Sequence, residues 1–297
     1  MTIGGGRRHL MLGVAVVVSL LAVVETTVAL VAPFRAPTDA DWGAAATAVR
    51  AGFRPGDLIV AAPAWADPIL RVQLGDLIPP ELAARMDDDR FARVWEVSQR
   101  GAEAPAAAGG TTTVDERFGR LRVRLVERPA EIVSYDFVAH WADARVSRRD
   151  VSRRDARGAV VACALAGERI VCPAPGNTLH RQLVEVDQKL REALLTEPVA
   201  GAAVVIEFPA VPLGRALVIA TGLHDTWMRK AARGTVEARL TVGDQTTELP
   251  VTSDDSGWTR TRIDTTARAG QTVPVKLEIT SAAPNDRFFA FAAEARR

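Results

Sequence analysis

Hydrophobic and polar positions divide this chain into three parts. Residues 10–32 form one apolar run that contains a single charged side chain. After a short polar stretch, helical periodicity alternates with two apolar runs typical of strands, over residues 57–63 and 94–98. From residue 114 onward, apolar side chains recur at every second position in segment after segment. The pattern predicts an α+β protein with a transmembrane helix in residues 1–35, a small α/β layer in residues 36–113 and an antiparallel β-sandwich in residues 114–297.

The first apolar run is long enough to cross a membrane. Its 23 residues rise about 34 Å as a helix, against a hydrocarbon core of about 30 Å. Arg7 and Arg8 precede it and aspartates follow it, so the positive-inside rule places the N-terminus in the cytoplasm and the bulk in the periplasm or outside the cell. A signal peptide cleaved near residues 27–29 is the alternative, but the run exceeds the roughly 7 to 15 apolar residues of such peptides. We therefore expect residues 10–32 to be a signal anchor.

The two cysteines fit an oxidising compartment. Cys163 and Cys172 lie symmetrically about Gly167 and Glu168, so a two-residue hairpin turn there sets the cysteines opposite each other. At a non-hydrogen-bonded pair the Cα atoms approach to about 4.5 Å, which a disulfide can bridge. We predict a disulfide rather than a metal site, because the pair has no histidine near it in the sequence.

The α/β layer begins with a helix over residues 38–53, capped by Thr38 or Asp39. A strand, short helical pieces broken at residues 79–80 and a second strand follow, an order that predicts two parallel strands. The Gly- and Ala-rich residues 101–113 are either a linker between domains or a loop at the edge of the layer.

The segments of period two predict which faces of the sandwich are buried. In residues 120–125, leucine and valine alternate with arginine, which gives one apolar and one basic face. A hairpin that turns at residues 243–244 sets Val236 opposite Val251, so both strands agree on the inner face. Residues 179–195 fit either a helix or a strand, and both remain open at this point.

Composition excludes one class of partner. The formal net charge is +1, so no global field attracts nucleic acid, and we expect no such partner. Only 3 of the 37 basic residues are lysines, a bias that we attribute to genomic coding. The repeat VSRRDVSRRD, residues 146–155, is either an exposed duplication without a role or a basic loop that meets anionic lipid or polysaccharide.

The sequence contains no complete catalytic constellation. G-x-S-x-G, Walker and H-E-x-x-H motifs are absent from it. Paired carboxylates for glycoside hydrolysis stay open, because the fold sets their spacing. The three aspartates at residues 87–89 are expected to form a solvated helix end rather than a metal site. We predict no catalytic residue, no metal ligand and no cofactor.

Two parts of the chain resemble known families. The segment AVRAGFRPGDLIVAAPAW, followed by RVWEVS, is similar over roughly residues 40–100 to the extracytoplasmic region of polytopic glycosyltransferases that use lipid-linked sugars. Those enzymes have many membrane helices and an acidic catalytic residue in their first external loop, so a chain with one such helix is not expected to form their donor site. The stretches VEARLTVGDQTTELPV and RFFAFAAEA, within roughly residues 200–297, resemble the galactose-binding type of jelly roll used as a carbohydrate-binding module. That resemblance implies a jelly-roll sandwich and, among the functions of that fold, sugar binding.

The loop GLHDTWMR is the best candidate for a ligand site. It contains His224, Asp225, Trp227 and Arg229. A sugar site combines an aromatic plane for the C–H face of the ring with polar groups for the hydroxyls, and this loop supplies both. The alternative is that Trp227 packs beneath the loop while Asp225 pairs with Arg229. Trp65, after the first strand, either touches a ligand at the strand end or caps the α/β layer.

These observations favour a single-pass, membrane-anchored, extracytoplasmic envelope protein without catalysis, whose β-sandwich binds carbohydrate. One alternative is an enzyme or accessory factor that processes or transfers glycans during assembly of envelope polysaccharide. Another is a structural envelope protein with no small ligand. The expected partners are the membrane, through residues 10–32, a glycan or polysaccharide, and a membrane protein.

Overall fold

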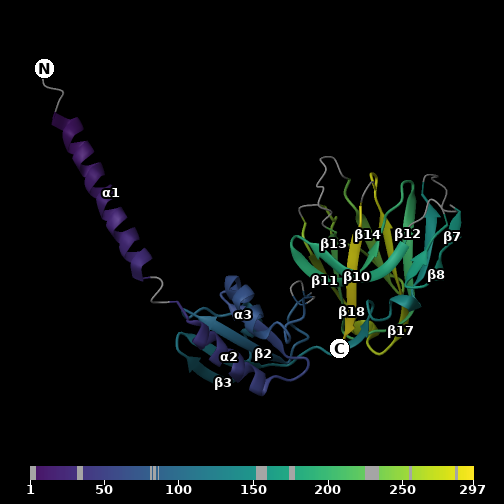
Figure 1. The fold of residues 1–297 in the computed structure, drawn as a ribbon. Coiled ribbons are helices and arrows are strands. Elements are labelled where there is room, and N and C mark those ends of the chain that lie inside the picture. Colours follow the sequence, from purple (N-terminus) through teal and green to yellow (C-terminus); the bar gives the residue numbers. More distant parts are fainter. Residues whose placement is uncertain are drawn as a thin grey trace. The chain divides into compact units, whose positions relative to one another are not determined.

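The computed structural model describes residues 5–31, 36–80, 82, 85, 87–151, 159–173, 178–224, 234–253, 256–284 and 287–297. The chain forms two compact units, one made of Met1–Leu77 with Arg93–Arg128 and the other of Ile78–Ala92 with Pro129–Arg297. Figure 1 shows the elements of both. Because residues 78–92 belong to the second unit, the chain passes from one unit to the other three times.

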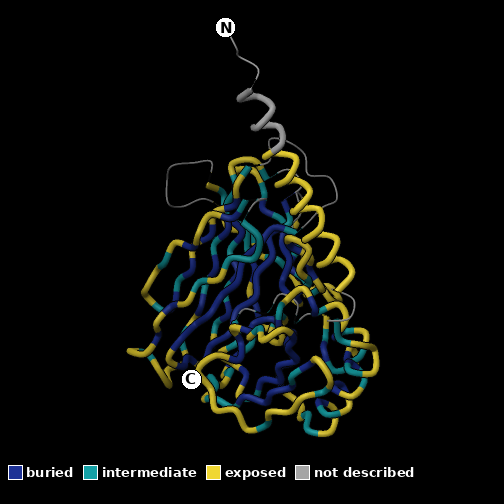
Figure 2. Tube along the Cα trace, turned by 90° about the vertical axis from the view of Figure 1, so that its left-hand side faces the viewer, coloured by how far each residue is buried: buried dark blue, intermediate teal, exposed yellow. Residues whose placement is uncertain are grey.

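The N-terminal helix α1 (Gly5–Val31) confirms the predicted apolar helix. Its segment Gly13–Val31 is long and apolar enough to cross a membrane, a test that a signal sequence near an N-terminus also passes. Every residue of that segment is exposed, as Figure 2 shows.

The first unit contains a four-stranded sheet accompanied by two helices that follow α1. Its elements are α2 (Asp39–Gly52), β1 (Leu58–Ala62), the 3₁₀ turn η2 (Ala64–Ala66), α3 (Asp67–Leu74), β2 (Arg93–Gln99), the 3₁₀ turn η4 (Pro105–Ala107), β3 (Thr111–Phe118) and β4 (Leu121–Glu127). The sheet order is β1-β2-β4-β3. β1 and β2 are parallel, as predicted, while β4 is antiparallel to both β2 and β3.

Strands β3 and β4 show that the α/β part extends beyond residue 113. We expected the sandwich to begin at residue 114, but both strands continue the sheet of β1 and β2. The alternation in residues 120–125 is the period of any strand with one buried face, so it could not distinguish the two sheets. Residues 100–110 connect β2 to β3 and are a loop within this unit rather than a linker between domains.

Helix α2 begins at Thr38, one of its two predicted caps. The Thr38 hydroxyl accepts a hydrogen bond from the backbone N–H of Asp41 (3.2 Å). The Asp41 carboxylate accepts one from the backbone N–H of Thr38 (2.9 Å), which completes a capping box. The helix buries Trp42 and Val49 in the core of the first unit.

A buried carboxylate fixes the amino ends of β1 and β2. Asp57 accepts hydrogen bonds from the backbone N–H of Arg54 (2.9 Å), from Arg93 Nε (3.0 Å) and from Trp95 Nε1 (2.9 Å). Gly56 has a φ of 95°, which favours glycine, so the Pro-Gly-Asp sequence forms the turn that delivers this carboxylate. Since Arg93 and Trp95 lie on β2, Asp57 joins two strands that are far apart in the sequence.

The second unit is a sandwich of two antiparallel sheets. One sheet has eight strands, in the order β16-β13-β18-β11-β10-β9-β8 with β5 paired to β18, and the other has six, in the order β15-β14-β17-β12-β6-β7. The strands of the first are β5 (Val133–Asp136), β8 (Ala164–Ala166), β9 (Arg169–Val171), β10 (Thr178–Val186), β11 (Lys189–Thr196), β13 (Ala216–Leu223), β16 (Thr259–Asp264) and β18 (Phe289–Arg296). Those of the second are β6 (Arg145–Asp150), β7 (Val160–Ala162), β12 (Ala202–Pro212), β14 (Glu237–Val242), β15 (Gln245–Glu248) and β17 (Thr272–Thr280); the 3₁₀ turns are η5 (Trp141–Asp143) and η6 (Thr266–Arg268). A single hydrophobic core takes side chains from both sheets, among them Phe208, Leu277 and Phe291.

The segment that fitted either a helix or a strand is a β-hairpin. Residues 179–195 belong to β10 and β11, which pair along their length. Asp187 and Gln188 both have positive φ, 51° and 60°, as the central residues of a type I′ turn require. This turn matches the twist of the flanking strands, so it favours the hairpin over the helix.

The hairpin of β14 and β15 turns at residues 243–244 as predicted, but its far end has a different register. Val236 pairs with Thr252, so the predicted pair with Val251 is wrong, and Val251 is exposed. The reason is Pro250, which has no N–H to continue the ladder, so pairing resumes one residue later.

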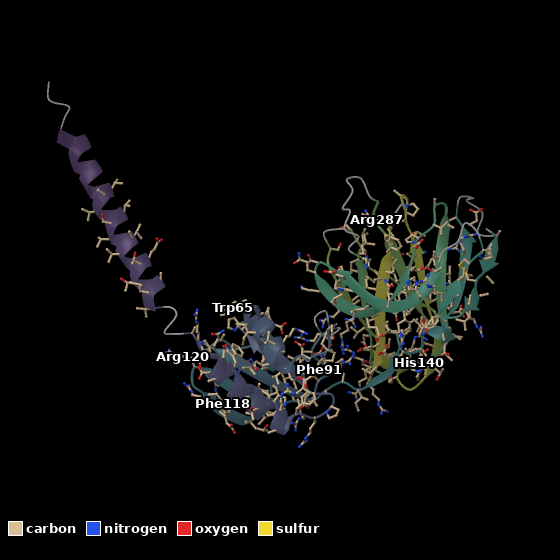
Figure 3. The ribbon with its side chains drawn as sticks, viewed as in Figure 1. Trp65, Phe91, Phe118, Arg120, His140 and Arg287 are labelled. Atoms are coloured by element: carbon tan, nitrogen blue, oxygen red, sulfur yellow. A yellow bond between two sulfur atoms is a disulfide. The ribbon has the colours of Figure 1, made fainter. Side chains whose placement is uncertain are left out.

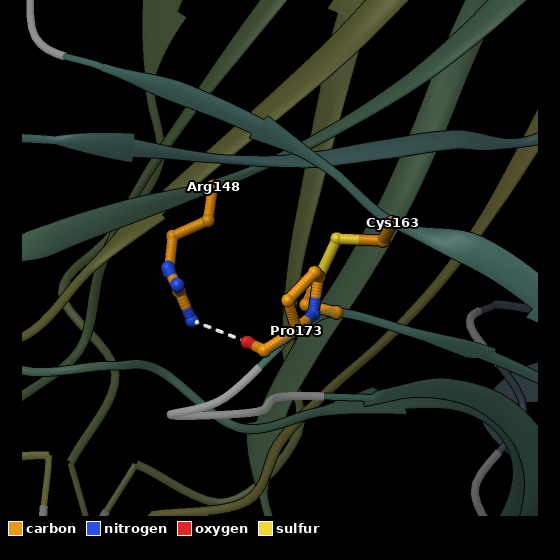
Figure 4. Close-up of a disulfide and its surroundings, with 4 residues drawn as sticks. Arg148, Cys163 and Pro173 are labelled. Carbon is orange, nitrogen blue, oxygen red and sulfur yellow. Dashed lines mark hydrogen bonds between the residues drawn. A yellow bond between two sulfur atoms is a disulfide. The ribbon is translucent and has the colours of Figure 1, made fainter.

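The predicted disulfide between Cys163 and Cys172 is present (Figure 4). The two Cα atoms are 4.1 Å apart, and Gly167 at the turn has a φ of 63°, as a type II′ turn requires. Cys172 is buried in the core, and Arg148 of β6 donates a hydrogen bond to the carbonyl oxygen of Pro173 (3.2 Å). The disulfide hairpin of one sheet is therefore tied to the other sheet.

A buried cluster of charges attaches the segment between α3 and β2 to the sandwich. The guanidinium of Arg296 has no exposed surface and forms ion pairs with Asp87 (2.7 Å) and Glu294 (2.6 Å). Glu131 is a third partner of the same guanidinium (3.3 Å). The interpretation of residues 87–89 as a solvated helix end is therefore wrong for Asp87, whose side chain is only 5% exposed and is paired, whereas Asp89 is exposed.

Replacing both cysteines with serine is expected to lower the free energy of unfolding by about 2–3 kcal/mol, because the disulfide closes a short loop in the unfolded chain. Denaturant unfolding of the oxidised protein and of the Cys163→Ser, Cys172→Ser variant measures the difference. The reduced wild-type protein should unfold at the midpoint of the variant. Equal midpoints for oxidised and reduced protein would show that the disulfide contributes nothing.

Replacing Arg296 with methionine is expected to lower the free energy of unfolding by about 3–5 kcal/mol, because Asp87 and Glu294 lose their buried partner and keep only the partly exposed Arg260 and Arg90. Arg262 offers a matched control, since it also pairs with Glu131 but is exposed. Arg262→Met should therefore cost less than about 1 kcal/mol. Thermal unfolding of the two variants compares them, and equal losses would contradict the role given to burial.

Candidate functional site

A cleft lined by arginines lies at one end of the sheet in the first unit. It encloses about 360 Å³, a volume typical of small-molecule sites. Its walls come from the carboxyl end of β2, the turn between β3 and β4, and the segment that precedes α2. The lining residues, called the arginine cleft below, are Pro37, Ser98, Gln99, Arg100, Gly101, Arg117, Gly119, Arg120, Leu121 and Arg122. Figure 3 labels Arg120 and, in the same unit, Trp65.

Two turns with left-handed backbone shape the cleft. Arg100 has a φ of 57°, uncommon for a residue other than glycine, and Gly101 follows with a φ of 73°, so the chain turns sharply where β2 ends. Gly119, in the turn between β3 and β4, has a φ of 56°. A Cβ atom there would collide with the Asp41 carboxylate, so glycine allows this turn to approach the first turn of α2.

The cleft carries a positive charge that its neighbours offset only in part. Arg122 donates two hydrogen bonds to Asp115 (2.6 and 2.7 Å), and this contact lowers the pKa of the Asp115 carboxyl. Arg117 acts on the same carboxylate through its charge alone, and Arg120 has no hydrogen-bonded or ion-paired partner in the part of the chain that the structure describes. Among the described residues, no acidic side chain belongs to the lining. An anion that enters the cleft therefore meets guanidinium groups and no lining carboxylate.

The inner wall of the cleft has a polar group without a partner. Gln99 is only 4% exposed, and its side-chain amide forms no hydrogen bond with any described residue. Its neighbour Ser98 donates a long hydrogen bond to the carbonyl oxygen of Arg122 (3.4 Å). The Gln99 amide atoms are not among the buried side-chain atoms that lack a partner in the described part of the chain, so they are accessible to water or to a ligand in the cleft. The cleft thus combines arginine guanidinium groups with a neutral amide that can both donate and accept hydrogen bonds.

Trp65 lies outside the lining but close to one of its members. It belongs to η2, directly after β1, and is 59% exposed, so it does not cap the core of the α/β layer. Arg100 Cζ lies 5.9 Å from the centroid of the Trp65 ring, within the range of a cation–π contact. Trp65 and Arg100 follow the carboxyl ends of two neighbouring parallel strands, the place where sheets of this kind bind ligands. Ligand contact by Trp65 itself stays a prediction.

Of the segment GLHDTWMR proposed as a sugar site in the sandwich, the structure describes only Gly222 and Leu223, which end β13, and His224. His224 follows β13, its backbone N–H donates to the carbonyl oxygen of Phe288 (2.9 Å), and the two rings lie 6.3 Å apart. Asp225, Trp227 and Arg229 lie outside the described residues, so the site they would form stays a prediction. Within the described ranges, no group of three or more His, Cys, Asp or Glu side chains is placed to hold a metal ion.

The sequence analysis missed the arginine cleft. Its arginines were attributed to coding bias, and residues 114–128 were assigned to the wrong unit, which separated Arg120 from Arg100. One local signal was available: in RFGRLR, two arginines flank Phe118 and Gly119, so a tight turn at this glycine brings both guanidinium groups to one end of a hairpin.

Comparison with known proteins gives no family. No family model matches the chain, and no curated protein matches it. The similar solved structures include the CBM51-2 and INT domains of Clostridium perfringens ZmpB, 14% identical, with a TM-score of 0.29 over 39% of this chain and 25% of that one. They also include CBM51 from Clostridium perfringens GH95 in complex with methyl-galactose, 8% identical, with a TM-score of 0.29 over 39% of this chain and 81% of that one.

A xylan-binding domain from CBM 22 is 11% identical, with a TM-score of 0.26 over 50% of this chain and 92% of that one. TM-scores this low do not establish the fold or the ligand of the present chain. Nothing in these comparisons supports the resemblance of residues 40–100 to glycosyltransferases. The functional conclusion therefore rests on the geometry of the molecule.

Proposed function

We propose that this is a single-pass membrane protein that holds an anionic carbohydrate in the arginine cleft, with its bulk outside the cytoplasm. The observation that carries the proposal is the lining itself, in which Arg100, Arg117, Arg120 and Arg122 surround a cleft with no carboxylate among its described residues. The guanidinium fork matches the geometry of a carboxylate, sulfate or phosphate group.

The neutral part of the lining suits a saccharide better than a free inorganic ion. Gln99 offers a side-chain amide, and Ser98 a hydroxyl, to ligand groups that both donate and accept hydrogen bonds, as sugar hydroxyls do. A volume of about 360 Å³ leaves room for more than the anionic group. We therefore favour an acidic sugar unit, as part of a polysaccharide of the envelope.

Binding, not catalysis, is the proposed activity. Hydrolysis of a glycosidic bond uses two carboxyl groups across the scissile bond, whereas the described lining offers cations and amides. The membrane placement is supported by the apolar segment of α1 and by Arg7 and Arg8 before it. The disulfide is consistent with an oxidising compartment outside the cytoplasm.

A second candidate is sugar binding by the sandwich, which we propose as a jelly roll. The observation that favours it is the position of His224 at the end of β13, where its ring lies beside that of Phe288. In this alternative Trp227, Asp225 and Arg229 bind the sugar. A membrane protein partner stays a further prediction.

The decisive test compares two polysaccharides that differ only in charge. Polygalacturonate and its fully methyl-esterified form share one backbone, so a site built from arginines should bind the first and not the second. The full chain is reconstituted in nanodiscs and its binding is measured by interferometry at low and at physiological salt. We expect Arg117→Ala with Arg120→Ala to weaken binding of polygalacturonate by about tenfold or more, because charge-assisted hydrogen bonds are lost.

Matched control variants are Arg181→Ala and Arg239→Ala, which remove exposed arginines of the sandwich. They should leave binding unchanged. Equal binding of the charged and esterified polymers, or binding untouched by loss of Arg117 and Arg120, would refute the cleft as the site. Loss of binding in Trp227→Ala alone would favour the sandwich candidate instead.

A further inference from the structure

The helical segment after β1 exposes an apolar face. From residue 64 to residue 72, all of the exposed residues are apolar: Ala64, Trp65, Pro68, Ile69 and Val72, called the apolar face below. The three large ones are exposed to 59% (Trp65), 43% (Ile69) and 80% (Val72). Their spacing of four and three residues puts them on one side of the helix.

The same helical segment buries other apolar residues in the core. Ala66, Leu70 and Leu74 are buried on its opposite side. A surface helix usually presents polar residues to water, whereas a helix that is apolar on both sides is normally covered on both. Arg71 and Asp67 of α3 form an ion pair (2.6 Å) and lie between the two faces. The exposed side therefore has the composition of a contact surface.

Basic side chains border this face. Arg100 Cζ lies 5.9 Å from the Trp65 ring centroid, and Arg100 is also part of the arginine cleft. Tryptophan with aliphatic side chains, next to arginine, is the combination found where helices lie in the interface of a membrane. Arginine supplies the attraction to anionic headgroups, and the ring and the aliphatic groups supply burial at the acyl boundary.

The chain itself keeps this face near a bilayer. The apolar segment of α1 ends at Val31 and α2 begins at Asp39, so residues 32–38 are the whole connection. Seven residues at about 3.3–3.6 Å each reach at most about 25 Å. If α1 spans the membrane, the start of α2 stays within that distance of the surface, and even weak insertion of the unit is favoured by the high effective concentration.

We propose that the apolar face lies on the membrane that holds α1, with Trp65, Ile69 and Val72 inserted at the interface and Arg100 against an anionic headgroup. The inference rests on the membrane placement of α1 in the proposed function, and not on the carbohydrate ligand. A second copy of the chain is a weaker occupant. Stable protein interfaces bury about 800 Å² on each partner, more than so short a segment supplies.

The test places a reporter on the face in the full chain. Both natural cysteines are in the disulfide, so Val72→Cys gives the single free thiol, which is labelled with an environment-sensitive fluorophore. The labelled protein is reconstituted in vesicles of phosphatidylcholine and phosphatidylglycerol that carry bromine on the acyl chains. Glu116→Cys is the matched control, since Glu116 is exposed on β3, the strand farthest from β1 in the sheet.

We expect bromolipid quenching at residue 72 to be several-fold greater than at residue 116. Trp65→Ser with Ile69→Ser should reduce it toward the control value, and Arg100→Gln should remove its dependence on phosphatidylglycerol. Circular dichroism of each variant checks that the unit is folded. In nanodiscs without anionic lipid, polygalacturonate binding should be unchanged by Ile69→Ser, which separates this surface from the carbohydrate site.

Flotation of the protein with the vesicles reports separately on α1. Flotation with equal quenching at residues 72 and 116 would overturn the docking proposal and leave the membrane anchor intact. Failure to float would overturn both. A label at residue 72 that is shielded from aqueous iodide but not quenched by bromolipid would show that protein covers the face, and would also overturn the proposal.

Discussion

The ion pair between Arg296 and Asp87 is the contact on which the arrangement of the chain depends. The guanidinium of Arg296 has no exposed surface, so it must be neutralised where it lies, and one of its partners comes from 209 residues earlier in the sequence. That partner sits in residues 78–92, which interrupt the first unit. The last strand of the sandwich therefore requires a piece of chain that lies between two strands of the α/β sheet.

Because residues 78–92 interrupt the first unit, its strands β1 and β2 must pair across this gap in the sequence. β1 and β2 become parallel neighbours only after the chain has left the unit and returned. Asp57 closes this gap through Arg93 and Trp95, at the amino ends of the two strands. Trp65 and Arg100 follow the carboxyl ends of the same strands, next to the arginine cleft.

Features that depend on neighbouring residues could be predicted from the sequence. The disulfide between Cys163 and Cys172 and the turn at residues 243–244 were predictable, because two-residue turns fix the register of the strands beside them. Val236 pairs with Thr252 and not with the predicted Val251, because Pro250 has no N–H and shifts the ladder by one residue. The predictions that Asp87 is exposed and that the sandwich begins at residue 114 were wrong for a different reason. Contacts between residues far apart in the sequence decide which carboxylate pairs with which arginine and which sheet a strand joins. The same holds in part for the cleft: the turn at Gly119 places Arg120 at the end of the hairpin, but nothing local predicts that Arg124 is buried and paired with Glu96 (2.8 Å) while Arg120 lines the cleft.

A net charge of +1 does not weaken the case for an anion site. At physiological salt, charges more than about 8 Å away are largely screened, so a ligand responds to the groups around it and not to the sum over the chain. Most acids near the cleft are engaged: Asp115 binds Arg122, and Asp41 caps α2. Arg100 stands at the meeting point of the cleft and the apolar face, so a headgroup and a glycan compete for the same guanidinium. Occupancy of the cleft by a soluble polyanion should therefore depend on the anionic lipid content of the membrane that carries the protein.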